Sequence, residues 1–202
     1  MTAKDVATFE RCISVGGVAL FPADTVYGLA TEPQSREGVE RLYRLKGRDP
    51  GVPAALMFFS LDLALAALPE LWGRTREAVL QLLPGGVTLL LPNPRRRFPL
   101  ACGPAPERLG LRVPALSGEL APLAAVRWPV LQSSANRSGG RPVRRLAAVD
   151  EQIRRGVDME LDGGVLPGAE STVVDLTRYE QSGEFEILRE GAVPAEEVAA
   201  RL

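Results

Sequence analysis

Short apolar segments, each bounded by glycine, proline or polar residues, recur along the whole chain and constrain its fold more than any other feature. Segments of this kind, such as Val18 to Pro22 and Ala54 to Phe59, are typical of buried strands. Between them lie segments with apolar residues at helical spacing, for example Ser35 to Lys46. Strands and helices intermixed over 202 residues predict one α/β domain, residues 1–202, in which helices cover a sheet.

The other predicted elements follow from the same patterns. Helices are predicted at Val6 to Val15, Leu61 to Ala67, Thr75 to Leu83 and Val149 to Arg155. Further strands are predicted at Val87 to Leu91, Leu109 to Val113, Val130 to Ser133, Met159 to Leu161, Ser171 to Leu176 and Phe185 to Leu188. Asp24 to Ala30 is predicted to be a polar turn, and the proline-rich stretch Pro92 to Pro106 an exposed irregular connection.

The absence of histidine limits the chemistry that this chain can perform. It removes the commonest general base, the Ser-His-Asp triad and most catalytic zinc sites. Two cysteines outside any C-x-x-C pair are too few for a disulfide framework and predict a reducing compartment. No segment has the length and apolarity of a membrane span or a signal peptide, so we expect a soluble, cytoplasmic protein with no membrane partner.

Charge gives no global indication of a partner. The 24 basic and 25 acidic residues leave a formal net charge of −1, so a polyanion would have to be held by a local patch. Two such patches are candidates, Arg95 to Arg97 and the group formed by Arg137, Arg141, Arg144 and Arg145. Solvated loops and a phosphate- or RNA-facing surface are both open interpretations.

Three polar segments could bind a ligand. Asp24 to Leu29 follows a predicted strand, and Lys46-Gly47-Arg48 places two cations at the end of a helix. Ser133 to Gly140 carries hydroxyls and glycines that allow backbone N–H groups to approach an anion, although it lacks the P-loop spacing. Taken singly, each segment is explained at least as well by an ordinary turn, helix terminus or loop.

The order and joint presence of these segments carry more information than any one of them. Together with other motifs they resemble the YrdC/Sua5 family over residues 10 to 195. The segments that carry the resemblance are Phe21 to Ala30, Lys46 to Arg48, Pro84 to Thr88, Leu111 to Pro114, Ser133 to Gly139, Glu170 to Asp175 and Leu188 to Gly191. The resemblance implies a single YrdC-like domain, a twisted mixed sheet flanked by helices, as in the short bacterial form.

The resemblance also implies a reaction. Members of this family form threonylcarbamoyl-AMP and pyrophosphate from L-threonine, bicarbonate and ATP, a nucleotidyl transfer that serves the t6A modification of tRNA. It implies Mg²⁺ that arrives with ATP and no dedicated metal site, because no carboxylate cluster is visible in the sequence. Implied partners are tRNA or double-stranded RNA and the t6A transferase machinery downstream.

The same resemblance assigns roles to eight residues. Lys46 and Arg48 are the implied catalytic cations on the ATP phosphates. The implied nucleotide contacts are Ser134, Asn136 and Arg189. The implied threonine contacts are Thr25, Arg112 and Ser171, with the planar guanidinium of Arg112 paired with the threonine carboxylate.

Four positions depart from the family pattern. Ala23 stands where the family usually has threonine, Asp49 where it has proline, Val52 where it has a basic or polar residue, and Met57 where it often has histidine. These changes leave two alternatives open. One is a YciO-like paralogue that binds nucleotide or RNA without the synthesis, and the other is a carbamoyl-transferring relative that acts on another small molecule.

Overall fold

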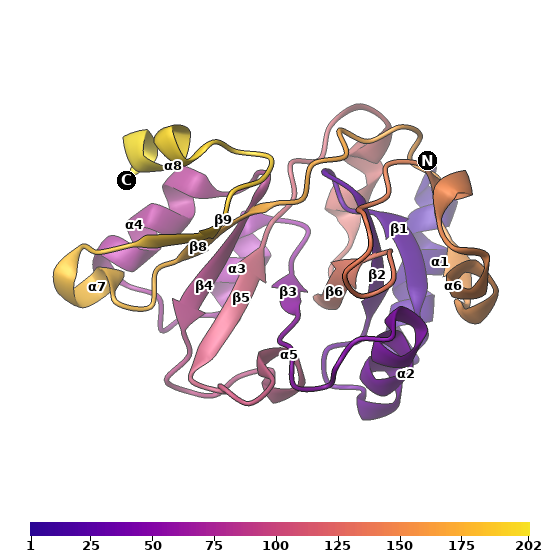
Figure 1. Ribbon diagram of the computed structural model, residues 1–202, viewed down its shortest axis with the longest axis horizontal. Coiled ribbons are helices and arrows are strands. Elements are labelled where there is room, and N and C mark those ends of the chain that lie inside the picture. Colours follow the sequence, from indigo (N-terminus) through magenta and orange to yellow (C-terminus); the bar gives the residue numbers. More distant parts are fainter.

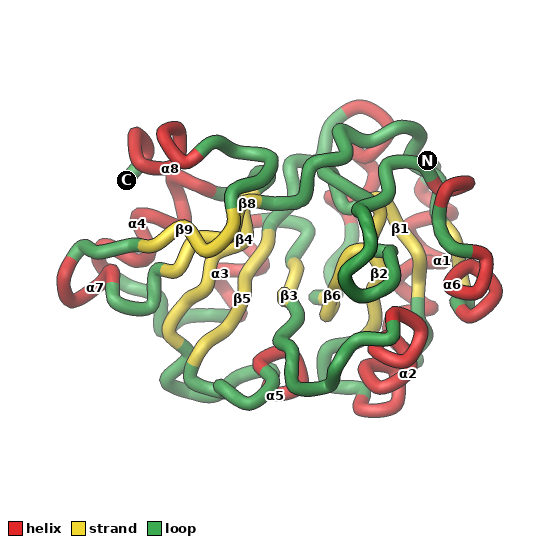
Figure 2. Tube along the Cα trace, in the orientation of Figure 1, coloured by secondary structure: helices red, strands yellow, loops and turns green.

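A nine-stranded mixed sheet runs through the whole molecule in the computed structural model, which describes all residues 1–202 (Figures 1 and 2). The strands lie in the order β7-β1-β2-β6-β3-β5-β4-β8-β9. Their bounds are β1 Ala19–Pro22, β2 Tyr27–Thr31, β3 Ala55–Met57, β4 Val87–Pro92, β5 Arg108–Arg112, β6 Val130–Ser134, β7 Met159–Glu160, β8 Thr172–Asp175 and β9 Glu186–Arg189. The predicted α/β class with a mixed, helix-flanked sheet is therefore confirmed.

Parallel and antiparallel pairs alternate irregularly across this sheet. The pairs β1/β7, β3/β5 and β4/β8 are parallel. The other neighbours are antiparallel, including the β1–β2 hairpin, in which Phe21 pairs with Gly28. Three central strands, β6, β3 and β5, thus come from distant parts of the chain, and polar residues at their ends are brought together.

The helices lie around both ends of the sheet, with α1, α2 and α6 near β1 and α4, α7 and α8 near β8 (Figure 1). Their bounds are α1 Ala3–Ser14, α2 Arg36–Lys46, α3 Leu61–Ala67, α4 Gly73–Leu82, α5 Pro99–Cys102, α6 Glu151–Gly156, α7 Tyr179–Ser182 and α8 Ala195–Arg201, with 3₁₀ helices η1 Gly118–Ala125 and η2 Leu146–Ala148. None of the helices combines the length and apolar character that crossing a membrane needs.

Local sequence explains how α2 begins and ends. The Ser35 hydroxyl accepts a hydrogen bond from the backbone N–H of Gly38, which caps the first turn. Gly47 ends the helix in a left-handed conformation with φ of 61°, which glycine adopts without steric cost. Lys46 therefore belongs to the last turn of the helix, whereas Arg48 follows the Gly47 cap, so the two side chains point in different directions.

The prediction of a polar turn from Asp24 to Ala30 is wrong from Tyr27 onward. Tyr27–Thr31 is strand β2, and all five of its residues are buried between β1 and β6. The turn itself is limited to residues 23–26, where the Ala23 N–H donates to the Val26 carbonyl. The polar residues at the start of the segment concealed an apolar strand that pairs on both edges. Helices α5, α7 and α8 were also not predicted.

Two of the departures from the family pattern lie in an apolar cluster beneath α1. Phe9 packs on Phe21 and Phe59, with ring centroids 5.4 and 5.7 Å apart. Ala23 and Met57 belong to the same cluster and are fully buried. A polar side chain at either position would face this cluster and would need a partner within it.

Candidate functional site

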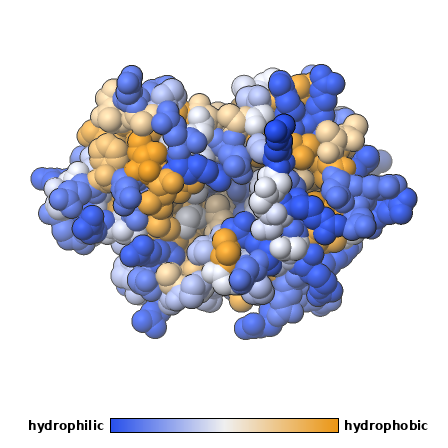
Figure 3. Space-filling model, in the orientation of Figure 1, coloured by the Kyte–Doolittle hydropathy of each residue, from blue (hydrophilic) through white to orange (hydrophobic).

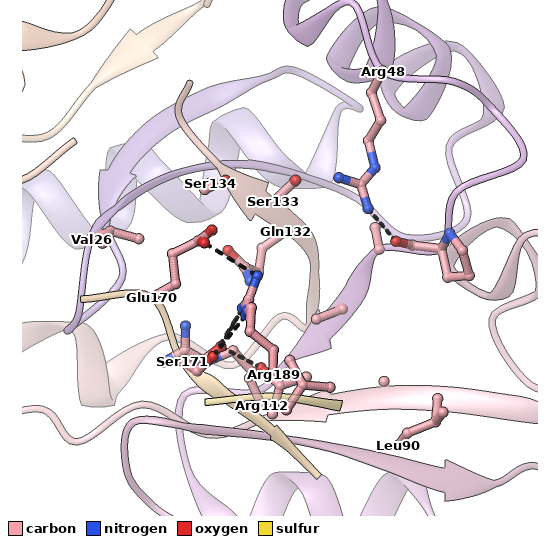
Figure 4. Close-up of a pocket in the computed structure, with 16 residues that line it drawn as sticks. Val26, Arg48, Leu90, Arg112, Gln132, Ser133, Ser134, Glu170, Ser171 and Arg189 are labelled. Atoms are coloured by element: carbon pink, nitrogen blue, oxygen red, sulfur yellow. Dashed lines mark hydrogen bonds and ion pairs between the residues drawn. The ribbon is translucent and has the colours of Figure 1, made fainter. Parts of the chain in front are cut away.

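A pocket of about 250 Å³ opens over the central strands β3, β4, β5 and β6, and we call it the central pocket. Hydrophobic residues gather on the upper left of the face seen in Figure 3, over the β8–β9 end, and most of the remaining face is hydrophilic. The pocket is lined by Val26, Arg48, Pro53, Ala54, Ala55, Thr88, Leu90, Gly110, Arg112, Gln132, Ser133, Ser134, Glu170, Ser171, Val173 and Arg189 (Figure 4).

Small residues leave room at the bottom of this pocket. Ala55 of β3 pairs with Gly110 of β5, and both line the pocket. Because neither carries a large side chain, the polar groups around them face an open space and not a packed core.

Arg48 approaches the pocket from the α2 side. Its guanidinium donates to the carbonyls of Val52 and Pro53, and it lies 5.7 Å from the centroid of the Tyr43 ring. No carboxylate pairs with it. Its positive charge is therefore held in place and left uncompensated.

Arg189 of β9 faces Arg48 across the pocket (Figure 4). Its Nη2 donates to the Ser171 carbonyl at 2.9 Å, and its Nη1 lies 3.4 Å from a carboxylate oxygen of Glu170. This strand can approach so closely because position 191 is glycine, where a Cβ atom would lie 2.2 Å from the Glu170 carbonyl oxygen. The Ser171 hydroxyl lies 2.7 Å from the Thr88 hydroxyl, which fixes it toward the pocket.

Arg112 and Asp24 form a buried ion pair beside the pocket. Nη2 of Arg112 lies 2.6 Å from Oδ1 of Asp24, and the two side chains are 2% and 7% exposed. Burial raises the pKa of the Asp24 carboxyl, and the charge of Arg112 opposes that rise. Asp24 also accepts the backbone N–H of Ala115 at 3.0 Å. Asp24 thereby fixes the guanidinium, while Nε of Arg112 is buried with no partner.

Lys46 does not line the pocket. It is fully buried, and its ammonium group donates to the carbonyls of Ser134 and Asn136, the latter at 2.8 Å. Burial and, to a lesser degree, the nearby Arg48 lower the pKa of Lys46 to about 8. Lys46 thus ties α2 to the segment that follows β6.

The segment after β6 is closed on itself by Asn136. The side-chain N–H groups of Asn136 donate to the carbonyls of Arg137 and Gly140, at 2.9 and 2.7 Å. The Ser138 N–H donates to the Lys46 carbonyl at 2.8 Å. After these contacts Oδ1 of Asn136 is buried without a partner.

Five of the eight residues that the sequence singled out line the central pocket, namely Arg48, Arg112, Ser134, Ser171 and Arg189. The other three, Lys46, Asn136 and Thr25, lie outside the lining. Thr25 is next to Asp24 and lines a neighbouring cavity. Sequence reasoning assigned no role to Thr88, Gln132 or Glu170, although two of these belong to motifs that it singled out. The two arginine clusters do not line the pocket, and Arg97 and Arg137 pair with Glu70 and Asp150.

Buried polar atoms without partners occur in the central pocket and beside it. Buried side-chain polar atoms nearly always have a hydrogen-bond partner, so an exception indicates a missing ligand or water. The protein has five exceptions, and three are Thr25 Oγ1, Arg112 Nε and Asn136 Oδ1. All three belong to the residues that the sequence singled out.

Fold and site together define an α/β protein with a pocket lined by arginines and hydroxyls at the ends of central strands. The chain belongs to the Sua5/YciO/YrdC family, whose family model, described as "Telomere recombination", matches residues 11–191. A threonylcarbamoyl-AMP synthase of Chromohalobacter salexigens is 32% identical over 187 residues, which are 91% of this chain and 96% of the relative. That of Hahella chejuensis is 29% identical over 163 residues, covering 81% and 88%.

An archaeal relative is longer. The threonylcarbamoyl-AMP synthase of Pyrococcus abyssi is 28% identical over 187 residues, and the match spans 92% of this chain but only 54% of the relative. The crystal structure of P. abyssi Sua5 complexed with L-threonine superposes with a TM-score of 0.84 at 27% identity, over 100% of this chain and 58% of that one. Escherichia coli YciO, at 22% identity and a TM-score of 0.80, shares the fold and covers 98% of this chain and 94% of its own.

Proposed function

We propose that this chain is a threonylcarbamoyl-AMP synthase, a nucleotidyltransferase that forms threonylcarbamoyl-AMP and pyrophosphate from L-threonine, bicarbonate and ATP. The observation that carries the proposal is the coincidence of three unpartnered buried atoms with residues of the family motifs. Similarity to relatives named threonylcarbamoyl-AMP synthase supports the same reaction. The product would serve the t6A modification of tRNA, with tRNA and the t6A transferase machinery as partners downstream.

In this proposal Arg48 and Arg189 bind the ATP phosphates. Guanidinium groups bind phosphate oxygens through paired N–H donors, and these two enter the pocket from opposite sides. Ser134 and the free Oδ1 of Asn136 contact the rest of the nucleotide. Lys46 contributes its charge through the wall of the pocket, since its N–H donors are engaged by the carbonyls of Ser134 and Asn136.

Arg112, Thr25 and Ser171 would hold threonine. The unpartnered Nε of Arg112 is a donor for the threonine carboxylate, and its other contact, to Asp24, keeps the guanidinium in place. Thr25 carries an unpartnered hydroxyl that can bind a second polar group. Ser171 is oriented by Thr88.

The proposed chemistry needs no nucleophile from the protein. Bicarbonate takes up a proton and releases water to give carbon dioxide, and the threonine amine attacks this carbon dioxide and loses a proton, which gives a carbamate. A carbamate oxygen then forms a bond to the α-phosphorus of ATP while the bond between that phosphorus and the bridging oxygen breaks, and pyrophosphate leaves. The protein contributes positioning and stabilisation of negative charge, which fixed arginines provide. A chain without histidine can perform both.

Mg²⁺ fits this proposal as a companion of ATP and not as a resident ion. No group of three or more Asp, Glu, His or Cys side chains is placed to hold a metal. The one carboxylate that lines the pocket, Glu170, is paired with Arg189. ATP phosphates and water would supply most of the oxygen ligands, as they do at many nucleotide sites.

Threonine-dependent release of pyrophosphate tests the proposal. The purified protein is incubated with ATP, bicarbonate and threonine, and with serine in a parallel reaction. We expect release with threonine and loss of ATP binding in Lys46→Ala and Arg48→Ala. Absence of release in every mixture would contradict the synthase proposal, and binding of tRNA that weakens steeply with salt would then indicate an RNA-binding paralogue.

A further inference from the structure

A second cleft lies where α4 begins, at the end of the molecule that also carries α7 (Figure 1). Its volume is about 360 Å³, and it shares no lining residue with the central pocket. We call it the α4 cleft. It is lined by Glu70, Leu71, Trp72, Thr75, Pro92, Asn93, Pro94, Glu107, Glu180 and Gln181.

The two remaining unpartnered buried atoms of the protein both belong to this cleft. One is the hydroxyl Oγ1 of Thr75, a residue only 2% exposed, and the other is Oε2 of Glu70. The backbone N–H of Thr75 is satisfied by Oε2 of Glu180 at 2.9 Å, and Oε1 of Glu70 accepts from Nε of Arg97 at 2.8 Å. Each residue is therefore held in place by one hydrogen bond, while one polar atom of its side chain has no hydrogen-bond partner.

The missing partner is a donor. An ionised carboxylate oxygen can only accept hydrogen bonds, and a hydroxyl can accept as well as donate. Both residues line one cleft, so a single group with several N–H bonds that enters this cleft is a candidate partner for both atoms. Because buried polar groups rarely remain unpaired, the pair marks a binding position and not a surface irregularity.

Charge indicates that this donor is a cation. Three carboxylates line the cleft, those of Glu70, Glu107 and Glu180. Of these only Glu70 has an ion pair, with Arg97, so two negative charges remain uncompensated. The indole of Trp72 also lines the cleft and is 68% exposed. An indole face attracts a cation that lies within about 6 Å of its centroid.

We propose that the α4 cleft binds a primary alkylammonium group, supplied by a free polyamine or by a lysine side chain of another protein. An ammonium has three donors, which match Oε2 of Glu70, the hydroxyl of Thr75 and one further carboxylate of the cleft. A divalent metal matches less well, because no three acidic side chains are placed to ligate one and indole offers it no oxygen.

Tryptophan fluorescence of the full chain tests this proposal. The chain has two tryptophans, so Trp128→Phe leaves Trp72 as the only indole reporter. Spermidine, N-acetyl-lysine amide and butylammonium are titrated at constant ionic strength, with tetramethylammonium as a cation that lacks N–H donors. We expect a saturable change with the primary amines, a weaker one with tetramethylammonium, and none when Trp72→Phe replaces Trp128→Phe.

Substitutions in the cleft separate specific binding from general attraction. Glu70→Gln and Thr75→Val should each weaken amine binding about tenfold, the size expected for one charged hydrogen bond. Glu77→Gln removes the same charge from the exposed side of α4 and should leave binding unchanged. Calorimetry with spermidine gives the same constants without a fluorophore.

The outcomes decide whether the α4 cleft binds an alkylammonium group and which molecule supplies that group. Equal binding by Glu70→Gln, Thr75→Val and the unsubstituted protein overturns it, as does binding of Ca²⁺ or Mg²⁺ in preference to every amine. Tighter binding of spermidine than of N-acetyl-lysine amide assigns the site to a free polyamine. Equal binding of the two assigns it to a lysine side chain.

Discussion

The central pocket and the α4 cleft each bring together three side chains of one charge, positive in the central pocket and negative in the α4 cleft. The central pocket gathers Arg48, Arg112 and Arg189, whereas the α4 cleft gathers three glutamates. The unpartnered buried atoms of the protein belong to Arg112 of the central pocket, to Thr25 and Asn136 beside it, and to Glu70 and Thr75 of the α4 cleft. The formal net charge of −1 for the whole chain indicates neither the arginines of the central pocket nor the glutamates of the α4 cleft. The comparison shows that one chain with almost no net charge can hold two local sites of opposite sign, for which we propose ligands of opposite charge.

The largest expected effect is that of Arg112→Ala, which removes the only ionic partner of Asp24. Loss of one partner of a buried pair costs about 3 to 5 kcal/mol in free energy of unfolding. Pyrophosphate release should fall about a hundredfold or more, because the threonine carboxylate loses its anchor. Urea unfolding and the release assay measure the two effects.

A double variant separates these two roles of Arg112. Asp24→Asn combined with Arg112→Ala removes the stranded charge, so it should recover part of the stability but none of the activity. Full activity in Arg112→Ala would remove this residue from the site and leave the central pocket without a carboxylate anchor.

Arg48→Ala should weaken ATP binding about tenfold to a hundredfold, since it removes a charged donor to phosphate. The fold should persist, because Arg48 contacts only two carbonyls and the Tyr43 ring. Arg44→Ala is the matched control, because Arg44 is an exposed cation of α2 that does not line the central pocket. Calorimetry with ATP compares them, and equal losses would indicate a general basic field in place of a defined pocket.

A pH profile tests the charge of Lys46. In the folded protein its pKa is lowered from 10.5 to about 8, so the ammonium loses its proton as the pH rises through that value. ATP affinity should then fall about threefold to tenfold, because a positive charge near the phosphates disappears. The unfolded chain keeps this proton up to its higher pKa, so this residue's contribution to stability rises with pH between the two values. Lys46→Met should bind ATP more weakly near neutral pH and show no such step.

The smallest effects are expected for two hydroxyls, one at each site. Without ligand, Thr25→Val and Thr75→Val should each stabilise the protein by about 1 kcal/mol, since each removes an unpaired buried hydroxyl. Thr172→Val is the contrast, because the Thr172 hydroxyl donates to the Val193 carbonyl and accepts two N–H bonds. It should lower the stability. Thermal unfolding is then measured with threonine or spermidine added. Thr25→Val should lose the stabilisation by threonine, and Thr75→Val should lose the stabilisation by spermidine. The reverse result would contradict the assignment of the two sites.

The sequence predicted what depends on local pattern. Most helices and strands lie within a few residues of their predicted bounds, because apolar spacing and glycine or proline breaks act over short stretches. Strand β2 was missed because its polar neighbours, Asp24 and Thr25, indicated a turn, whereas pairing with both β1 and β6 decides its conformation.

The site could be predicted only in part. Motifs indicated Arg112 and Ser171, but the pairing of Arg112 with Asp24 joins residues 88 positions apart, and no local pattern shows it. The direction of Lys46 into the wall of the pocket depends on how α2 packs on β2, the strand that pairs with β6. The α4 cleft had no sequence signal, because Glu70 and Thr75 acquire meaning only through the partners they lack.

The order in which the chain is synthesised decides when the central pocket can form. Its lining begins at Val26 and ends at Arg189, close to the last residues of the chain. A chain synthesised from its N-terminus can form the β1–β2 hairpin early, but the arginine of β9 is the last residue of the pocket lining to be made. A partly made chain that ends before β9 therefore lacks one wall of the central pocket, the wall that carries Arg189.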